Sequence, residues 1–320
     1  ALLACVALPL PALAQDWPTR PVTLVVGFTP GGGADLVARV LGAAMGRVLG
    51  QSFVVDNRPG AGSSTAAAGV ARSAADGYTA LIASPSAIQV NPLVMPKVGY
   101  QADRDFAAVT QLVESPLIVA VNPQVGVKTV DELIARARKE SGKLSFSSSG
   151  VGAASHLAGQ LFQEASGTSR ASCPTGAMVH AAYKGAAPAM QDLMGNQVPV
   201  MMLDLASGLS IMKADKVRVL AIALPQRAKA LPEVPTFEEL GVKDVNAFAV
   251  HGVIGPAGMP ADVVSKLNAE LNKALQAPKV VKLFNEFGFE PTPGTPAEFK
   301  AHVRAESERW GAVIRASGVA

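Results

Sequence analysis

A buried strand that runs directly into a glycine-rich turn constrains the fold of this chain more than any other feature. Residues 22–28 lack the polar alternation of a half-exposed strand, and Val25 and Val26 are typical of a strand covered on both faces. Pro30 and the glycines after it end the strand and allow a sharp turn. Apolar residues at a helical period over 34–49 then predict a helix. The pattern indicates an α/β sheet protein in which backbone N–H groups at the helix start can bind an anion.

The same arrangement recurs in the middle of the chain. Residues 144–156 again combine a strand, a loop of small residues and the start of a helix predicted over 154–165. In parallel sheets, ligands collect at the carboxyl ends of the strands, where such loops lie. Two loops of this design therefore indicate a ligand held from both sides.

Length and composition favour two lobes and argue against a nucleic-acid partner. A chain of 320 residues is longer than a usual single domain, and its hydrophobic content of 49% is enough to build full cores. The net charge is only +3, the basic residues are scattered, and aromatic residues make up only 5%. This pattern gives no support to DNA or RNA binding.

The N-terminal segment has the pattern of a secretory signal. Residues 1–14 are apolar and uncharged, and they close on Ala12-Leu13-Ala14, which fits an A-x-A cleavage site. The stretch is too short to span a bilayer, which needs about 20 residues. We expect a periplasmic protein whose mature form keeps only Cys173 and forms no internal disulfide. An ordinary N-terminal strand or helix, or a lipoprotein site at Cys5, is the alternative.

Strand and helix patterns alternate along the rest of the chain, as in folds built from βαβ units. Two apolar strands, at 117–121 and 248–254, are interpreted as crossovers between the lobes. A chain that crosses twice has a hinge and a cleft between its lobes. The first lobe is then formed by residues 15–118 and 253–320, and the second by residues 119–252.

Motifs of the common enzyme classes are absent or incomplete. The first glycine loop imitates a dinucleotide-binding fingerprint, including an acid at Asp56 about 20 residues later, but Leu36 stands where the last glycine is required. No G-x-S-x-G elbow occurs, and Gly142-Lys143 lacks the serine or threonine of a P-loop. The four histidines are too far apart for a zinc site. We expect no enzyme, cofactor or metal, and an NAD-dependent oxidoreductase is the less favoured alternative.

Four ionisable residues are candidates for ligand contact. Asp35, in the first turn of a helix, either stabilises the helix dipole, by about 0.3–1 kcal/mol, or faces a ligand's hydroxyl, ammonium or bridging water. His156, at the start of the second helix, either contacts the ligand or caps the helix. Lys184 either neutralises a second carboxylate or lies in solvent. Asp204 follows a strand, a position that favours the cleft.

Serine hydroxyls supply further candidates. They follow two predicted strands and are Ser84, Ser86, Ser147, Ser148 and Ser149. A hydroxyl donates a hydrogen bond without adding a formal charge, so these residues suit the reversible binding of an anion.

An ordered set of short motifs along the whole mature chain resembles one family. The motifs are Trp17-Pro-x-Arg20-Pro, Phe28-Thr-Pro-Gly-Gly-Gly-Ala-Asp35, Val55-Asp-Asn-Arg-Pro-Gly-Ala-Gly62, Ala75-Asp-Gly-Tyr78, Tyr183-Lys-Gly-Ala-Ala-Pro188, Leu231-Pro-Glu-Val-Pro-Thr-Phe-x-Glu239 and Gly255-Pro-Ala-Gly-Met-Pro260. Each motif alone is weak, but their order is specific. The chain resembles the Bug-type (TctC-like) receptors, the extracytoplasmic solute-binding proteins of tripartite tricarboxylate transport systems.

This resemblance implies a two-lobe α/β periplasmic-binding-protein fold, of the Venus flytrap type, that closes on a small carboxylate. The carboxylate would be a dicarboxylate, an acidic amino acid or an aromatic acid, held by the two loops partly through ordered water. Carried onto this sequence, the implied contacts are Phe28, Thr29, Pro30, Gly31, Gly32 and Asp35 in the first loop and Ser147, Ser148, Ser149, Gly150, Ser155 and His156 in the second.

Two segments depart from the family pattern. Residues 168–177 form a longer loop, with Cys173, where the family runs into a short strand. Pro85 stiffens the motif between Ser84 and Ser86, and we expect it to alter ligand selectivity.

The resulting expectation is a monomeric binding protein without chemical turnover. It would deliver a small organic carboxylate to the membrane permease subunits of a tripartite tricarboxylate transporter. Delivery to a sensor kinase is the alternative, which the sequence does not separate from transport. A DNA-binding regulator with the same ligand module is disfavoured, because a signal and not a helix-turn-helix precedes the module.

Overall fold

The computed structural model describes residues 17–95, 97–140, 142–169, 172–173 and 178–317. Its strands are β1 (Val22–Val26), β2 (Phe53–Asn57), β3 (Thr79–Ala83), β4 (Phe106–Val121), β5 (Leu144–Ser148), β6 (Met178–Ala182), β7 (Val200–Asp204), β8 (Arg218–Ile222), β9 (Phe248–Pro256) and β10 (Glu290–Pro291). Its helices are α1 (Gly33–Leu49), α2 (Ser64–Ala71), α3 (Asn91–Val94), α4 (Ala102–Asp105), α5 (Val130–Lys139), α6 (Ala154–Ala165), α7 (Ala186–Met194), α8 (Leu205–Lys213), α9 (Ala261–Gln276), α10 (Pro278–Glu286) and α11 (Pro296–Ser317), with short turns η1 (Ala61–Ser63), η2 (Ser86–Val90) and η3 (Pro123–Val125). The signal predicted at residues 1–14 and part of the loop predicted at 168–177 lie outside the described residues.

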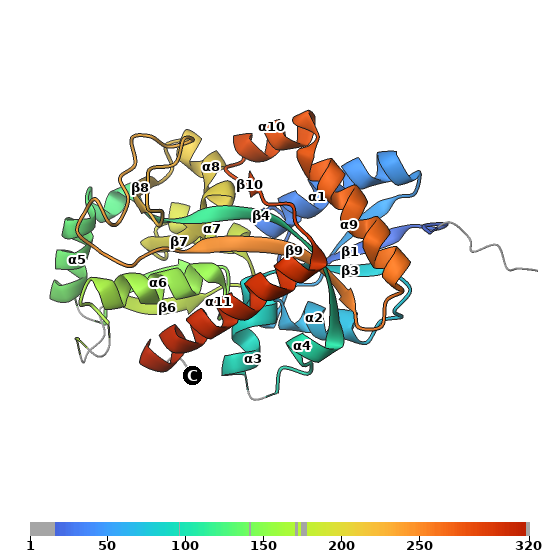
Figure 1. Cartoon of the computed structure of the whole chain (residues 1–320). Coiled ribbons are helices and arrows are strands. Elements are labelled where there is room, and N and C mark those ends of the chain that lie inside the picture. The colour runs from blue at the N-terminus through green and yellow to red at the C-terminus, as the bar shows by residue number, and fades with distance from the viewer. Residues whose placement is uncertain (1–16, 96, 141, 170–171, 174–177, 318–320) are drawn as a thin grey trace, which may run out of the picture.

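The first sheet is built around β1, with β2 and β3 parallel on either side and β9 and β4 continuing the sheet in the antiparallel sense (Figure 1). Leu24 and Val26 pack with α1 and α9, whereas Val25 packs on the opposite face with α2. Successive strand residues point to opposite faces, so a strand covered on both faces needs apolar residues at every position. The structure confirms the covered strand predicted from the sequence.

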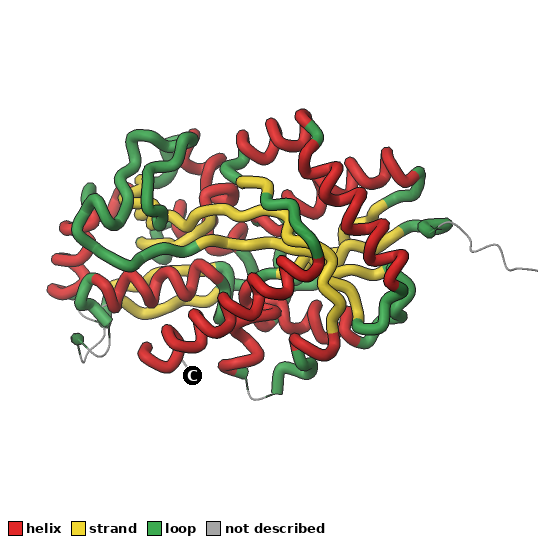
Figure 2. Tube along the Cα trace, in the orientation of Figure 1, coloured by secondary structure: helices red, strands yellow, loops and turns green. Residues whose placement is uncertain are grey.

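The second sheet has the order β4-β7-β5-β6, and β8 also pairs with β4. Met202 belongs to an apolar cluster with α5 and α6, and Leu203 to a cluster on the other face with α7 and α8. Helices therefore cover both faces of this sheet as well, which Figure 2 shows for the whole molecule.

One long strand, β4, belongs to both sheets, and β9 lies beside its first part. Residues 106–116 of β4 pair with β9, and residues 117–121 pair with β7 and β8. The crossover strands predicted from the sequence lie in β4 and β9, and the pairing of β4 changes between Pro116 and Leu117. All of β9 pairs within the first sheet. The exact lobe boundaries stay a prediction.

The C-terminal helix α11 packs against both lobes. Near its start, Phe299 belongs to the apolar cluster around α2, and near its end Trp310 and Ile314 belong to the cluster around α6. Figure 1 shows α11 running from the junction of the sheets along the second lobe. The division predicted from the sequence assigns the whole of α11 to the first lobe, so this contact with the second lobe was not anticipated. No helix among the described residues is long and apolar enough to cross a membrane.

Candidate functional site

A cavity lies where the two lobes meet. Its empty space, including the opening to solvent, is about 480 Å³. It is lined by residues of both lobes: Phe28, Gly32, Gly33, Ala34, Ser84, Pro85, Ser86, Leu117, Ser149, Ala153, Ala154, Ser155, Ala186, Asp204, Ala249 and His251.

The turn between β1 and α1 brings the backbone close to the second lobe. Gly31 has a φ of +88°, a conformation that favours glycine, and Gly32 is the N-cap of α1. Gly33 needs to lack a side chain for another reason, because a Cβ atom there would lie 2.8 Å from Asp204 Oδ1. The predicted glycine turn therefore makes a close contact between lobes possible.

Two N–H groups that the sequence predicts to be free in this turn have protein partners. Gly31 N donates to Asp35 Oδ2 at 2.9 Å, and Gly33 N donates to Ser207 Oγ at 2.9 Å. Within the part of the chain that the structure describes, Ala34 N has no hydrogen-bond partner, and Ala34 lines the cavity. This helix start therefore offers fewer free N–H groups to an anion than the sequence predicts.

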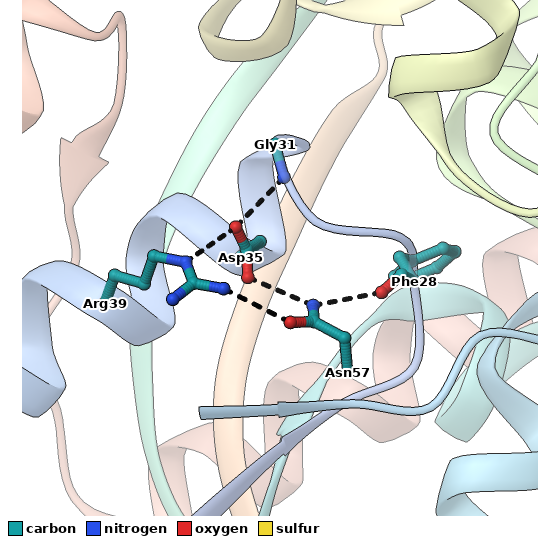
Figure 3. Close-up of polar contacts among 5 residues, drawn as sticks. All are labelled: Phe28, Gly31, Asp35, Arg39 and Asn57. Carbon is teal, nitrogen blue, oxygen red and sulfur yellow. Dashed lines mark hydrogen bonds and ion pairs between the residues drawn. The ribbon is translucent and has the colours of Figure 1, made fainter. Parts of the chain in front are cut away.

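Asp35 is held behind the turn by other protein groups (Figure 3). Its Oδ2 accepts hydrogen bonds from Gly31 N and Arg39 Nε, both at 2.9 Å, and its Oδ1 accepts one from Asn57 Nδ2 at 3.0 Å. Asn57 Nδ2 also donates to Phe28 O at 3.1 Å. Burial raises the pKa of Asp35, but the hydrogen bonds from Arg39, Gly31 and Asn57 outweigh it and lower the pKa below its ordinary value. The geometry supports the structural alternative for Asp35, which does not line the cavity.

Hydrogen bonds of its own serine hydroxyls hold the conformation of the second loop. Ser155 Oγ accepts a hydrogen bond from Ser149 N at 3.1 Å and lies 3.0 Å from Ser149 Oγ. Ser148 Oγ accepts from Gly150 N at 3.2 Å, and Ser147 Oγ donates to the backbone of β7 at 3.4 Å. Ser149 and Ser155 line the cavity, whereas Ser147, Ser148 and Gly150 are buried away from it.

His156 lies beneath the second loop in a stack with His180. The ring centroids are 3.8 Å apart, Gly152 N donates to His156 Nδ1 at 3.2 Å, and His180 Nε2 lies 2.6 Å from Ser148 Oγ. Burial lowers the pKa of His156 to about 4, and burial together with His156 lowers the pKa of His180 to about 3. The neutral pair supports the loop from behind, which favours the structural alternative for His156. The part played by His180 was not predicted.

The starts of α6 and α7 face the cavity together with the start of α1. The N-caps of α6 and α7 are Ala153 and Gly185, and neither helix has a side-chain cap. Ala154 and Ala186, their first residues, line the cavity. Helix starts carry positive partial charge and unpaired N–H groups, so three of them around one cavity favour an anion. The starts of α1 and α6 were predicted from the sequence as ligand-binding positions, whereas the start of α7 was not.

The first lobe also touches the loop before α7. Thr29 N donates to Lys184 O at 3.3 Å, and a Cβ atom at Gly185 would lie 2.2 Å from Thr29 Oγ1. The side chain of Lys184 is exposed and does not line the cavity. Lys184 thus contributes its backbone to the contact between lobes. Pro30 and Gly31 are exposed and also lie outside the lining.

Ser84 and Ser86 occupy the carboxyl end of β3, as predicted. Both are buried in the cavity wall, and their Oγ atoms lie 2.9 Å apart. Pro85 lies between them and also lines the cavity, where it precedes the π-helical turn η2. The side chains that follow this strand are therefore held in fixed positions at the site.

Asp204 ends β7 and caps α8. Its Oδ1 accepts from Ser207 N at 2.8 Å, and its Oδ2 accepts from Ser207 Oγ at 2.9 Å. It lies in the cavity wall, as its position after a strand predicts, and no other charged side chain occurs among the described lining residues. Ser207, which joins Asp204 to Gly33 of the first lobe, was not predicted.

His251 of β9 is a lining residue that the sequence analysis missed. It is 5% exposed, and its Nδ1 is buried without a hydrogen-bond partner among the described residues. Burial lowers the pKa of His251, while the Asp204 carboxylate and a hydrogen bond to the Ala83 backbone act in the opposite direction. A single histidine within the apolar run 248–254 is the signal that could have identified it.

The predicted contact residues thus separate into two groups. Those that line the cavity are Phe28, Gly32, Ser84, Ser86, Ser149, Ser155 and Asp204. Those that lie behind or outside it are Thr29, Pro30, Gly31, Asp35, Ser147, Ser148, Gly150, His156 and Lys184. Contact of either group with a ligand stays a prediction. No cluster of metal-binding side chains occurs in the described ranges.

Comparisons with known proteins identify relatives over nearly the whole chain. The family model for the tripartite tricarboxylate transporter family receptor (TctC) matches residues 37–319. BugT of Bordetella pertussis is 34% identical over 317 residues, which cover 99% of this chain and 95% of BugT.

Two solved structures from Rhodopseudomonas palustris are similar in fold and sequence. Rpa4515, solved with adipate, is 34% identical with a TM-score of 0.90, covering 95% of this chain and 99% of Rpa4515. MatC (Rpa3494), solved with bound malate, is 29% identical with a TM-score of 0.87, covering 93% of this chain and 100% of MatC. The predicted two-lobe periplasmic-binding-protein fold is confirmed.

Proposed function

This chain belongs to the tripartite tricarboxylate transporter receptor family, which consists of solute-binding receptors and not enzymes, and on this premise we propose that it binds a small organic carboxylate between its lobes. The observation that carries the proposal is the convergence of the starts of α1, α6 and α7 on one cavity. Their dipoles and unpaired N–H groups favour an anion, although no lysine or arginine is found in the described lining.

The serines at the cavity support the same ligand class. Within each of the pairs Ser84–Ser86 and Ser149–Ser155, one hydroxyl donates to the other, so each pair has one O–H left to donate to a carboxylate oxygen, either directly or through water. Neutral donors bind an anion without a buried ion pair, so that release does not require the separation of two opposite charges in a protein interior. The two Rhodopseudomonas palustris relatives were solved with adipate and with malate, which are small organic carboxylates of the proposed class.

The connections between the lobes support a receptor that closes on its ligand. Among the described strands only β4 pairs in both sheets, and hydrogen bonds such as Thr29 N to Lys184 O join the loops across the cavity. A ligand that contacts both lobes would stabilise this closed arrangement. We expect the closed form to deliver the acid in the periplasm to the permease subunits of a tripartite tricarboxylate transporter.

A thermal-shift and calorimetric screen of the purified protein tests the proposal. The panel contains dicarboxylates, acidic amino acids and aromatic acids, with adipate and malate among them. At a concentration 100 times its Kd, a ligand stabilises the native state by about 2.7 kcal/mol, which a melting curve resolves.

The matched controls are the amides of the same acids, which keep the shape but lose the charge. We expect at least one acid to raise the melting temperature while its amide does not. A panel in which no acid stabilises the protein, or in which the amides act as strongly as the acids, would refute carboxylate binding.

A further inference from the structure

Asp204 and His251 place a carboxylate and an imidazole in the wall of a cavity whose helix starts favour an anion. Asp204 comes from the end of β7 in the second lobe, and His251 comes from β9 in the first sheet. Asp204 is the only charged side chain among the described residues of the lining, and its charge has the same sign as that of a carboxylate ligand. The cavity therefore contains a feature that general affinity for carboxylates does not explain.

The Asp204 carboxylate has acceptor capacity left over. Each of its oxygens accepts one hydrogen bond from Ser207, whereas a carboxylate offers about four acceptor positions. No arginine, lysine or histidine within the described ranges forms an ion pair with Asp204. Asp204 is also partly exposed, so its remaining acceptor positions are open to a ligand.

His251 adds a buried ring nitrogen without a hydrogen bond, Nδ1, although the ring also interacts with the Ala83 backbone. The side chain is 5% exposed, it lines the cavity, and its buried Nδ1 has no hydrogen bond in the described structure. Its ring packs edge-on against Phe289, with ring centroids 6.2 Å apart. Buried polar atoms of native proteins are nearly always hydrogen-bonded, so the unpaired Nδ1 of His251 in a cavity wall indicates a partner that arrives with a ligand.

We propose that Asp204 and His251 form a polar subsite that selects carboxylates carrying a hydroxyl or ammonium group over the plain acids of the same skeleton. This inference rests on the proposed function, since it describes one end of the same ligand. A hydroxyl or ammonium group donates to Asp204, whereas a second carboxylate beside Asp204 meets a like charge with no cation to offset it. The subsite thus recognises a hydrogen-bond donor on the ligand, and the binding assay shows whether a hydroxyl or an ammonium group is preferred.

Matched sets of acids test the selection by calorimetry. One set is succinate, malate and aspartate, a second is propionate, lactate and alanine, and a third is phenylpropionate, phenyllactate and phenylalanine. Within the set that binds, we expect the hydroxy or amino acid to bind at least tenfold more tightly than the plain acid. Comparison of the hydroxy acid with the amino acid shows which donor the subsite prefers.

The variant Asp204→Asn connects this selectivity to the subsite. Asparagine caps helices about as well as aspartate, so α8 keeps its cap while the carboxylate is lost. We expect the preference for the donor-bearing acid to fall to less than threefold and the plain acid to bind more tightly. The matched control is Asp215→Asn, which removes an exposed carboxylate of the same lobe and should leave the ratio unchanged.

The outcomes separate this inference from the proposed function. If carboxylates bind but the plain acid equals its hydroxy and amino analogues, or if Asp204→Asn keeps the wild-type ratio, the subsite is refuted while carboxylate binding stands. If no carboxylate binds, the proposed function fails and the subsite fails with it. A second variant, His251→Gln, should weaken binding of the donor-bearing acid more than that of the plain acid. An equal effect on both acids would contradict a role for His251 in selection.

Discussion

The N–H group of Gly33, the first residue of α1, donates a hydrogen bond to Ser207 Oγ of α8 at 2.9 Å, across the boundary between the lobes. Ser207 Oγ in turn donates to Asp204 Oδ2 at 2.9 Å. A helix start of one lobe is thus bound through a hydroxyl to a carboxylate of the other lobe. The bond from Gly33 to Ser207 exists only while the lobes are together, so it favours the closed arrangement that a ligand would need.

The variant Ser207→Ala should weaken ligand binding, because the closed form loses a hydrogen bond that the open form does not have. A bond of this kind contributes about 0.5–1.5 kcal/mol, which corresponds to a loss of affinity of about twofold to twelvefold. Calorimetry with the best acid of the screen measures the loss. The control is Ser210→Ala, on the exposed side of the same helix, which should keep the wild-type affinity. Equal affinities of the two variants would show that the bond has no part in closure.

The variant Asp35→Ala should lower the free energy of unfolding by about 1–3 kcal/mol, since it leaves Gly31 N and Arg39 Nε without their acceptor. The control is Asp262→Ala, because Asp262 is also an acid in the first turn of a helix but is exposed. It should lose only the helix-dipole contribution, about 0.3–1 kcal/mol. Urea denaturation of both variants gives the comparison. If Asp35→Ala matched the control in stability and changed the ligand preference, Asp35 would be a ligand contact and not a support of the turn.

Local patterns in the sequence predicted the elements well where one physical signal decided the structure. The helical period over 154–165 predicts α6 at its observed bounds, because the loop before it and the end of its apolar pattern are both clear. The helix α10 was missed, because Pro278 follows α9 directly and proline usually ends a helix. Here it occupies the first position of a new helix, where its missing N–H is harmless.

The site was predicted less completely, because its contacts join residues far apart in the sequence. Ser149 and Ser155 lie in one loop, and their position at the cavity follows from local order. The bond from Gly33 to Ser207 spans 174 positions, and nothing in the local sequence of either residue indicates the other. The role of Asp35 could not be decided locally either, since its position at a helix start is compatible with ligand contact and with a structural role. Its hydrogen bond with Asn57, 22 positions away, favours the structural role.

Stability should fall as the pH decreases from about 6.5 towards 4, because His156 and His180 are buried as neutral rings. Their pKa values are about 4 and about 3 in the folded state, whereas an unfolded histidine has a pKa of 6.5. In this range the unfolded chain binds more protons than the folded chain, so lower pH favours unfolding. The full contribution is present above pH 6.5, and a shift of one pKa unit is worth about 1.36 kcal/mol.

Urea denaturation at a series of pH values from about 7.5 to about 4.5 measures how the free energy of unfolding changes with pH between the unfolded and folded pKa values of the two histidines. The variant His180→Asn should show a smaller slope over the same range, with a residual slope from His156 and from His251, whose pKa burial also lowers. Asp35 does not interfere, because its lowered pKa confines its contribution to lower pH. A wild-type stability that stayed constant from neutral pH to pH 4.5 would contradict neutral stacking of the two rings.

The variant Ala153→Asp should abolish or strongly weaken carboxylate binding while leaving the protein at least as stable as the wild type. Ala153 is the N-cap of α6, it has extended backbone angles, and its side chain makes no capping hydrogen bond. Aspartate at such a position caps the helix and is worth about 1 kcal/mol relative to alanine. The same carboxylate would enter the cavity wall and occupy the N–H groups that are proposed to hold the ligand.

The matched control is Ala153→Asn, which caps the helix without the charge, so the difference in affinity between the two variants measures the repulsion of an anionic ligand. Calorimetry with an acid and with its amide completes the experiment. The amide should show no such difference, and an acid that bound equally well to both variants would show that no carboxylate lies at the start of α6.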